Sequence, residues 1–182
     1  MRKAIVGAMA AGALLFTGAQ ATAEQPAANQ DAAKQDEAAD RVAIHNLLMA
    51  YGSTLDARDF DGFSKLFAKD GVYVAGSGEK ASGAQAGEMM RKVFAANASG
   101  SRSPNYHVFF NEVITFEGPD KAHSTSMSFW VVPDENRRPV PLMMGGYEDE
   151  IVRENGQWKF QSRTVKSMFP APAQAGAAGT AK

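Results

Sequence analysis

The feature that most constrains this fold is a change of hydrophobic period near Ser99-Gly100. Before this point apolar residues recur every three to four positions, which is typical of helices with one buried face. After it they alternate over long segments, which indicates strands with one buried face. A chain of helices followed by strands is expected to place its helices on one face of a curved, mainly antiparallel sheet, an α+β fold.

Three helices are predicted in the first half. The first covers about residues 40–55, and its buried face consists of apolar residues at helical spacing: Ile44, Leu47, Leu48, Tyr51 and Leu55. Asp59 is a good N-cap for a short second helix that turns Leu66 and Phe67 inward. Ser82 is the predicted cap of a third helix over residues 83–95.

One strand is predicted to start at residues 71–74, and four more follow the change of period. The later strands are expected at residues 105–116, 122–132, 141–153 and 157–166. Glu154-Asn155-Gly156 between the last two is a strong hairpin signal. The folded domain is therefore predicted to span residues 40–168.

The two ends of the chain differ in composition from this domain. Residues 1–23 join a basic start to an apolar stretch that ends in Ala21-Thr22-Ala23, which is typical of a secretory signal peptide cleaved after Ala23. A retained membrane anchor is the alternative. Residues 24–39 are predicted to be a disordered or helical tether, and residues 169–182 a disordered Pro/Ala/Gly tail. We therefore expect a periplasmic or secreted protein.

Charge and residue types narrow the function classes. Removal of Arg2 and Lys3 with the signal peptide would leave 17 of the 19 basic residues against 20 acidic ones. A weakly acidic chain without a basic cluster is not expected to bind nucleic acid, or a membrane after signal cleavage. The chain has no Cys, and its three His have no metal-ligand spacing, so neither a metal site nor a cofactor is expected.

Asp56 and His107 are the candidate catalytic pair. Asp56 falls at the end of the first predicted helix, where a carboxylate faces the negative end of the helix dipole, and Gly52 one turn earlier leaves room beside it. His107 lies in an apolar strand and is expected to alternate with Phe109 and Asn111 on one face. A buried imidazole held by a carboxylate is an oriented base.

Each candidate also has a structural interpretation. Asp56 could pair with Arg58 or Arg41, and His107 could be an ordinary core residue. Arg163 could stabilise a leaving anion or form an ion pair with Glu148 or Glu150. The predicted substrate-binding residues could equally serve in core packing; they are Tyr51, Phe109, Asn111, Trp130 and Tyr147.

Several short motifs carry a resemblance to a known family: Arg41-x-x-Ile44, Leu55-Asp56-x-x-Asp59, Asp70-Gly71-Val72-Tyr73, His107-x-x-x-Asn111 and Gly156-x-Trp158-Lys159-Phe160. In this order they resemble the SnoaL-like families of the nuclear transport factor 2-like superfamily, over nearly all of residues 40–168. The resemblance implies that superfamily's cone of helices on a strongly curved sheet. It places a catalytic Asp on Asp56, a general-base His on His107 and an Arg on Arg163.

The resulting hypothesis is a cofactor-independent lyase acting on a small hydrophobic cyclic or aromatic molecule. His107 would take a proton from carbon, Asp56 would orient it, and water, halide or an aldehyde would leave. An isomerase with the same base is one alternative, and a non-catalytic periplasmic binding or interaction protein is another. A contact near 3 Å between Asp56 and His107 would favour the enzyme, and a separation beyond about 6 Å the binder. The fold also suggests a homodimer or homotrimer.

Overall fold

The computed structural model describes residues 25–168, and their side chains from residue 36 onward. The chain divides into two compact units, residues 1–36 and 37–182. The predicted signal peptide and the predicted C-terminal tail lie outside the described residues. In the described part of the chain no helix is long and apolar enough to cross a membrane.

The three predicted helices are present, as α1 (Gln25–Asp56), α2 (Phe60–Ser64) and α3 (Gly83–Ala96). Residues 25–39 are helical and continue into the predicted first helix. Asp59 caps α2 as predicted, and its Oδ1 accepts a hydrogen bond from the Gly62 backbone N–H at 2.8 Å. The predicted cap of α3 is wrong in detail, because the Ser82 hydroxyl bonds to the Gln85 side chain instead of a backbone N–H.

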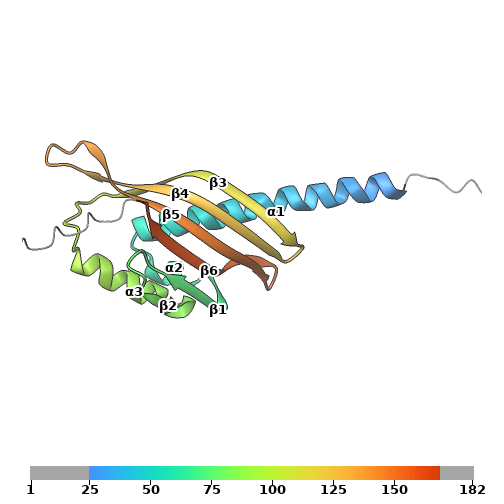
Figure 1. The fold of residues 1–182 in the computed structure, drawn as a ribbon, viewed down its shortest axis with the longest axis horizontal. Coiled ribbons are helices and arrows are strands. Elements are labelled where there is room, and N and C mark those ends of the chain that lie inside the picture. Colours follow the sequence, from blue (N-terminus) through green and yellow to red (C-terminus); the bar gives the residue numbers. More distant parts are fainter. Residues whose placement is uncertain (1–24, 169–182) are drawn as a thin grey trace, which may run out of the picture. The chain divides into compact units, whose positions relative to one another are not determined.

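Six strands form one curved sheet in the order β2-β1-β6-β5-β4-β3 (Figure 1). They are β1 (Phe67–Val74), β2 (Lys80–Ser82), β3 (Tyr106–Gly118), β4 (Lys121–Pro133), β5 (Pro139–Glu154) and β6 (Gln157–Ser167). Every neighbouring pair is antiparallel except β1 and β6, so the predicted α+β arrangement is confirmed. Phe67 opens β1 instead of ending the second helix, because it pairs with Phe160 of β6.

The predicted hairpin between β5 and β6 is also confirmed. Asn155 and Gly156 have φ angles of 52° and 77°, the positive values that a tight two-residue turn needs. A short turn of this kind sets the register of the strand pair next to it, and the pairing shifts by one residue farther along, between Glu150 and Ile151.

A bulge in β3 breaks the predicted alternation of that strand. The pairing with β4 shifts register between Phe110 and Val113, and Asn111 in the bulge has φ 53°. A bulge adds one residue to one strand, so the faces exchange beyond it. Asn111 and Val113 are therefore exposed, and Ile114 packs against the core in their place. The prediction that Asn111 shares the inward face of His107 is wrong.

The core lies between the helices and the inner face of the sheet. The buried face of α1, with Ile44, Leu48 and Leu55, packs in one cluster with Ile151 and Phe160 of the sheet. Helix α3 lies against β1 and β2, and α2 lies beside α3 (Figure 1). The helices therefore cover one face of the sheet and leave a concave space at its end.

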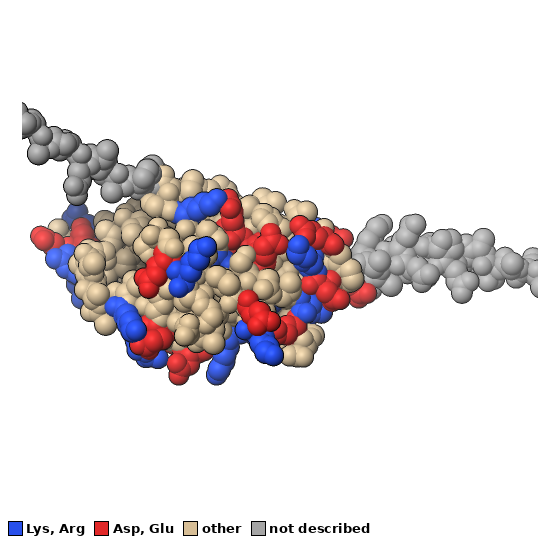
Figure 2. Space-filling view, turned by 60° about the horizontal axis from the view of Figure 1, so that its bottom comes forward, with Lys and Arg blue, Asp and Glu red and all other residues tan. Residues whose placement is uncertain are grey.

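Basic and acidic side chains are interspersed on the face shown in Figure 2. Exposed ion pairs of the described residues include Lys121 with Glu150 and Arg91 with Glu88. Figure 2 shows no broad basic area on this face, which is the pattern expected from the weakly acidic composition.

Candidate active site

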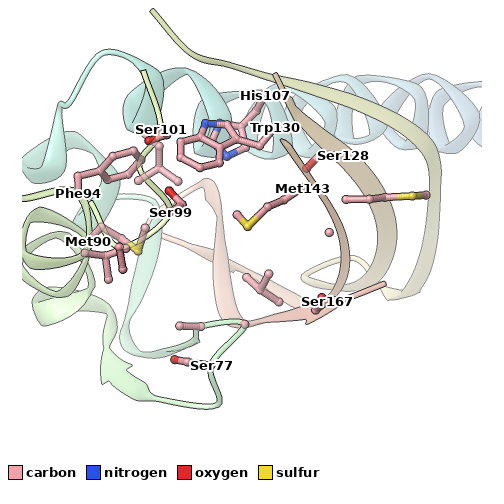
Figure 3. A pocket seen from close by; sticks show the side chains of 18 of the residues that line it. Ser77, Met90, Phe94, Ser99, Ser101, His107, Ser128, Trp130, Met143 and Ser167 are labelled. Atoms are coloured by element: carbon pink, nitrogen blue, oxygen red, sulfur yellow. The ribbon is translucent and has the colours of Figure 1, made fainter. Parts of the chain in front are cut away.

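A cavity of about 450 Å³ lies within the concave side of the sheet (Figure 3). Its walls are mostly apolar: Leu55, Met90, Val93, Phe94, Trp130 and Met143. The polar residues that line it include Tyr51, Tyr73, His107 and Ser128, together with several other serines, Asn97 and Lys166. Figure 3 shows His107 and Trp130 on one side of the cavity and Met90 and Phe94 on another. A mostly apolar cavity with some polar groups suits a small organic ligand.

Asp56 and His107 form a direct contact at this cavity. Asp56 Oδ1 lies 2.7 Å from His107 Nδ1, and Asp56 Oδ2 accepts the His107 backbone N–H at 2.8 Å. The two side chains are 17% and 10% exposed, so water screens the contact only weakly. A carboxylate can only accept a hydrogen bond, so Nδ1 carries the proton. Nε2 is then the nitrogen available to a ligand.

Gly52 explains how helix and strand approach closely enough for this contact. A Cβ at this position would lie 2.8 Å from Phe109 Cε2 and 2.9 Å from His107 Cβ, closer than such atoms can pack. The absence of a side chain at Gly52 therefore lets β3 reach the end of α1, where Asp56 is the last residue. The predicted space beside Asp56 is present.

Aromatic rings lie close to the imidazole. The centroids of Phe109 and Trp130 each lie 6.3 Å from that of His107, with interplanar angles of 22° and 27°. Tyr51 meets His107 edge-on with centroids 6.2 Å apart. Such packing restricts the ring to one plane. Because Nδ1 is fixed by Asp56, the direction of the Nε2 lone pair is fixed as well.

Two tyrosine hydroxyls supply further polar groups. The hydroxyls of Tyr51 and Tyr73 are 3.1 Å apart, and both residues line the cavity. Burial raises the pKa of Tyr73 to about 12 and raises that of Tyr51 well above its ordinary value. Both hydroxyls are therefore protonated near neutral pH. The Tyr51 hydroxyl also hydrogen-bonds to that of Tyr147, which in turn bonds to Ser128, so the four hydroxyls form one network.

Arg163 does not line the cavity. Its side chain is 0% exposed, its Nη1 lies 3.3 Å from Asp149 Oδ2, and its guanidinium carbon lies 4.0 Å from the Tyr51 ring centroid. Arg163 therefore sits beneath the cavity floor, and the expected contact with a leaving group does not fit this position. The alternative, a pair with Glu148 or Glu150 on the sheet surface, is wrong as well: the partner is Asp149 and both side chains are fully buried.

The predicted substrate-binding residues divide into three groups. Tyr51 and Trp130 line the cavity. Phe109 and Tyr147 lie behind the lining, where both pack on Tyr51 and the Tyr147 hydroxyl bonds to Ser128 at 2.8 Å. Asn111 is exposed in the β3 bulge, outside the cavity lining, so its predicted substrate contact is not supported.

Tyr73 and Asn105 were not predicted as site residues. Tyr73 could have been found from the inward face of its strand. Asn105 has no such signal, because its contact with Asp56 depends on how β3 meets α1. Among the residues whose side chains are described, no cluster of three or more His, Asp or Glu could hold a metal ion.

The sequence of residues 36–164 matches the family description "SnoaL-like domain". No curated protein is a significant match. Among solved structures, a Novosphingobium aromaticivorans protein provisionally assigned as an aromatic ring hydroxylase is 27% identical, with a TM-score of 0.58, over 72% of this chain and 90% of that one.

Two other solved structures share the fold at lower identity. A provisionally assigned scytalone dehydratase from Novosphingobium aromaticivorans is 20% identical over 82% of this chain and 99% of that one, with a TM-score of 0.61. Hexachlorocyclohexane dehydrochlorinase LinA-type3 from Novosphingobium barchaimii is 17% identical over 78% and 95%, with a TM-score of 0.61. The solved structures that share this fold include an NTF2-like protein, which confirms the predicted nuclear transport factor 2-like fold. With its match over residues 36–164, the chain belongs to the SnoaL-like domain family.

Proposed function

We propose that the protein is a cofactor-independent lyase for a small hydrophobic cyclic or aromatic molecule. Nε2 of His107 takes a proton from carbon, the freed electron pair forms a carbon–carbon double bond, and a leaving group on the neighbouring carbon departs with its bonding pair. Asp56 stabilises the imidazolium that forms. The leaving group is water, after protonation of a hydroxyl, or a halide. Release of an aldehyde would take a different course, in which His107 removes a hydroxyl proton, the O–H pair forms the aldehyde C=O, and the pair of the broken carbon–carbon bond stays on the other carbon.

The observation that carries this proposal is the 2.7 Å contact between Asp56 and His107 at the wall of an apolar cavity. The distance lies at the value expected for an oriented base, far below the 6 Å that would favour a binder. Among the described residues His107 Nε2 has no hydrogen-bond partner, so this nitrogen can act on a ligand in the cavity.

The tyrosine pair supports the departure of the leaving group. The linked hydroxyls of Tyr51, Tyr73, Tyr147 and Ser128 have four protons and three mutual hydrogen bonds, so they keep one O–H to donate and can stabilise a developing negative charge without Arg163. A dehydrochlorinase and a provisionally assigned dehydratase share the fold, which is consistent with elimination chemistry on this scaffold.

The test is turnover of cyclic compounds that carry a hydrogen next to a hydroxyl or a halide, followed by absorbance of the conjugated product and by halide release. Asp56→Asn and His107→Ala should each lower turnover on the order of 10²-fold or more, with urea unfolding still cooperative. The exposed His45→Ala is the matched control and should keep full activity.

Two other outcomes point to the alternatives. Exchange of a substrate hydrogen with deuterium from solvent, without loss of a group, would indicate an isomerase using the same base. Full activity of Asp56→Asn and His107→Ala on a true substrate would contradict the lyase. Saturable binding of the tested cyclic compounds without any turnover would also contradict it and would support a binding protein.

We also propose that the protein is exported. The N-terminal 23 residues have the pattern of a cleaved signal peptide. Sequencing the N-terminus of the protein from a periplasmic fraction should begin at Glu24. Recovery of the full chain from the cytoplasmic fraction would contradict export.

A further inference from the structure

Asp56 and His107 are connected to a second pair of polar residues, Arg58 and Asn105, which the proton transfer itself does not use. Asn105, 4% exposed, donates from Nδ2 to Asp56 Oδ1 at 2.7 Å. Arg58 donates from Nη2 to Asn105 Oδ1 at 2.5 Å. Asp56 therefore accepts three hydrogen bonds, from Asn105 and from the ring and backbone of His107.

The chemistry of its neighbours leaves the Asn105 amide one orientation. A guanidinium only donates hydrogen bonds and a carboxylate only accepts them. The amide oxygen must therefore face Arg58 and the amide nitrogen must face Asp56. Arg58 therefore donates to Asn105, and Asn105 donates to Asp56. His107 Nδ1 donates to the same carboxylate.

Arg58 adopts a backbone conformation that is costly for arginine. It follows the end of α1 with φ 61°, the left-handed region in which glycine is the usual residue at helix ends. The conformation turns the side chain back, so that Nη1 donates to the Leu55 carbonyl at 2.7 Å while Nη2 holds Asn105. Only the planar fork of an arginine can make both contacts in this way.

The guanidinium also packs on the cavity wall. Its carbon lies 3.9 Å above the ring centroid of Phe94, which lines the cavity. A positive charge over an aromatic face is attracted to it. Arg58 thus joins the end of α1, the start of β3 and the α3 wall at the point where Asp56 must be aimed.

From these contacts we infer that Arg58 and Asn105 are positioning residues, which hold the Asp56 carboxylate so that it orients His107. The inference rests on the proposed function, in which His107 is the base. A glycine at position 58 would relax the backbone. The strained conformation of Arg58 therefore indicates that its side-chain contacts matter at this position.

The test compares Arg58→Gly with Arg137→Gly. Arg137 also has a positive φ of 62° but is exposed in the turn between β4 and β5, so the same charge and the same backbone strain are removed away from the site. The readouts are the ¹⁵N resonances of the two His107 ring nitrogens, the side-chain amide resonances of Asn105, and kcat and KM on a substrate of the protein.

The parent and Arg137→Gly should show a single His107 ring form with a proton on Nδ1, toward Asp56. Arg58→Gly should unfold at a urea concentration close to that of the parent, while its Asn105 amide resonances broaden and His107 shows a mixture of ring forms. Its kcat should fall about 10-fold or more with KM changed less than about two-fold, the size typical of lost support behind a reacting group. Arg58→Lys should recover only part of the effect.

Asn105→Asp is the second variant. It keeps the shape and the acceptor for Arg58 but turns an acceptor toward Asp56, so it should alter the His107 resonances even if Arg58→Gly folds poorly. Parent-like His107 resonances in both variants would overturn the inference whatever the activity. Altered resonances with unchanged turnover would instead contradict the proposed function and leave the positioning role standing.

Discussion

At the scale of single residues, Arg58 and Arg163 show how burial changes the partners of an arginine side chain. Arg58 remains partly exposed and directs both ends of its fork to named acceptors. Arg163 is fully buried among aromatic rings, with Asp149 as its ionic partner and no hydrogen-bond partner for Nε or Nη2 among the described residues. A buried charge depends strongly on its single counter-charge.

Removal of that counter-charge gives a prediction at this scale. Asp149→Leu should lower the free energy of unfolding by about 3–5 kcal/mol, because it leaves the Arg163 guanidinium buried without a partner. Asp149→Leu combined with Arg163→Met should recover most of the loss. Urea unfolding followed by tryptophan fluorescence measures both. Equal losses in the single and the double variant would mean that packing and not charge sets the cost.

At the scale of elements, the site depends on how closely α1 and β3 approach. The contact occurs at Gly52, within one helical turn of Asp56, and against the strand that carries His107. Helix and strand are each predictable from local periodicity, but the distance between them is set by the side chains packed at their crossing.

Gly52→Ala should therefore be destabilising although alanine favours helices. The helix preference contributes up to about 1 kcal/mol in favour of alanine. Overpacking against Phe109 and His107 costs about 1–3 kcal/mol and moves β3 away from α1. We expect a net loss of stability in urea unfolding and a weaker Asp56–His107 contact. Ser53→Ala, exposed on the same helix, is the control and should not destabilise.

At the scale of the whole molecule, three tyrosines share one buried cluster between α1 and the sheet. Tyr51 packs on Tyr73 and Tyr147, with ring centroids 6.3 and 5.4 Å away. Burial is the largest cause of the raised pKa of each hydroxyl. Since the unfolded chain ionises these groups near pH 10, it binds fewer protons than the folded protein above that pH.

The contribution of these hydroxyls to stability should therefore be constant up to about pH 10 and fall as the pH rises toward the pKa of Tyr73, about 12. Urea midpoints measured at pH 8, 10 and 11 test this fall. Tyr73→Phe should make it shallower, whereas Tyr106→Phe, at an exposed position, should not. A flat profile of the parent protein would show that the hydroxyls ionise without unfolding it.

The sequence by itself determined the fold class, the pair Asp56 and His107, and the order of the elements except the short strand β2, which was not predicted. These depend on local periodicity, turn residues and family motifs, all of which are written along the chain. Only the tertiary structure decided that Arg163 is buried on Asp149, that Asn111 leaves the inner face, and that Arg58 reaches Asp56 through Asn105. A bulge reverses the faces of a strand, and contacts between distant residues depend on register and close approach, so no local pattern encodes them.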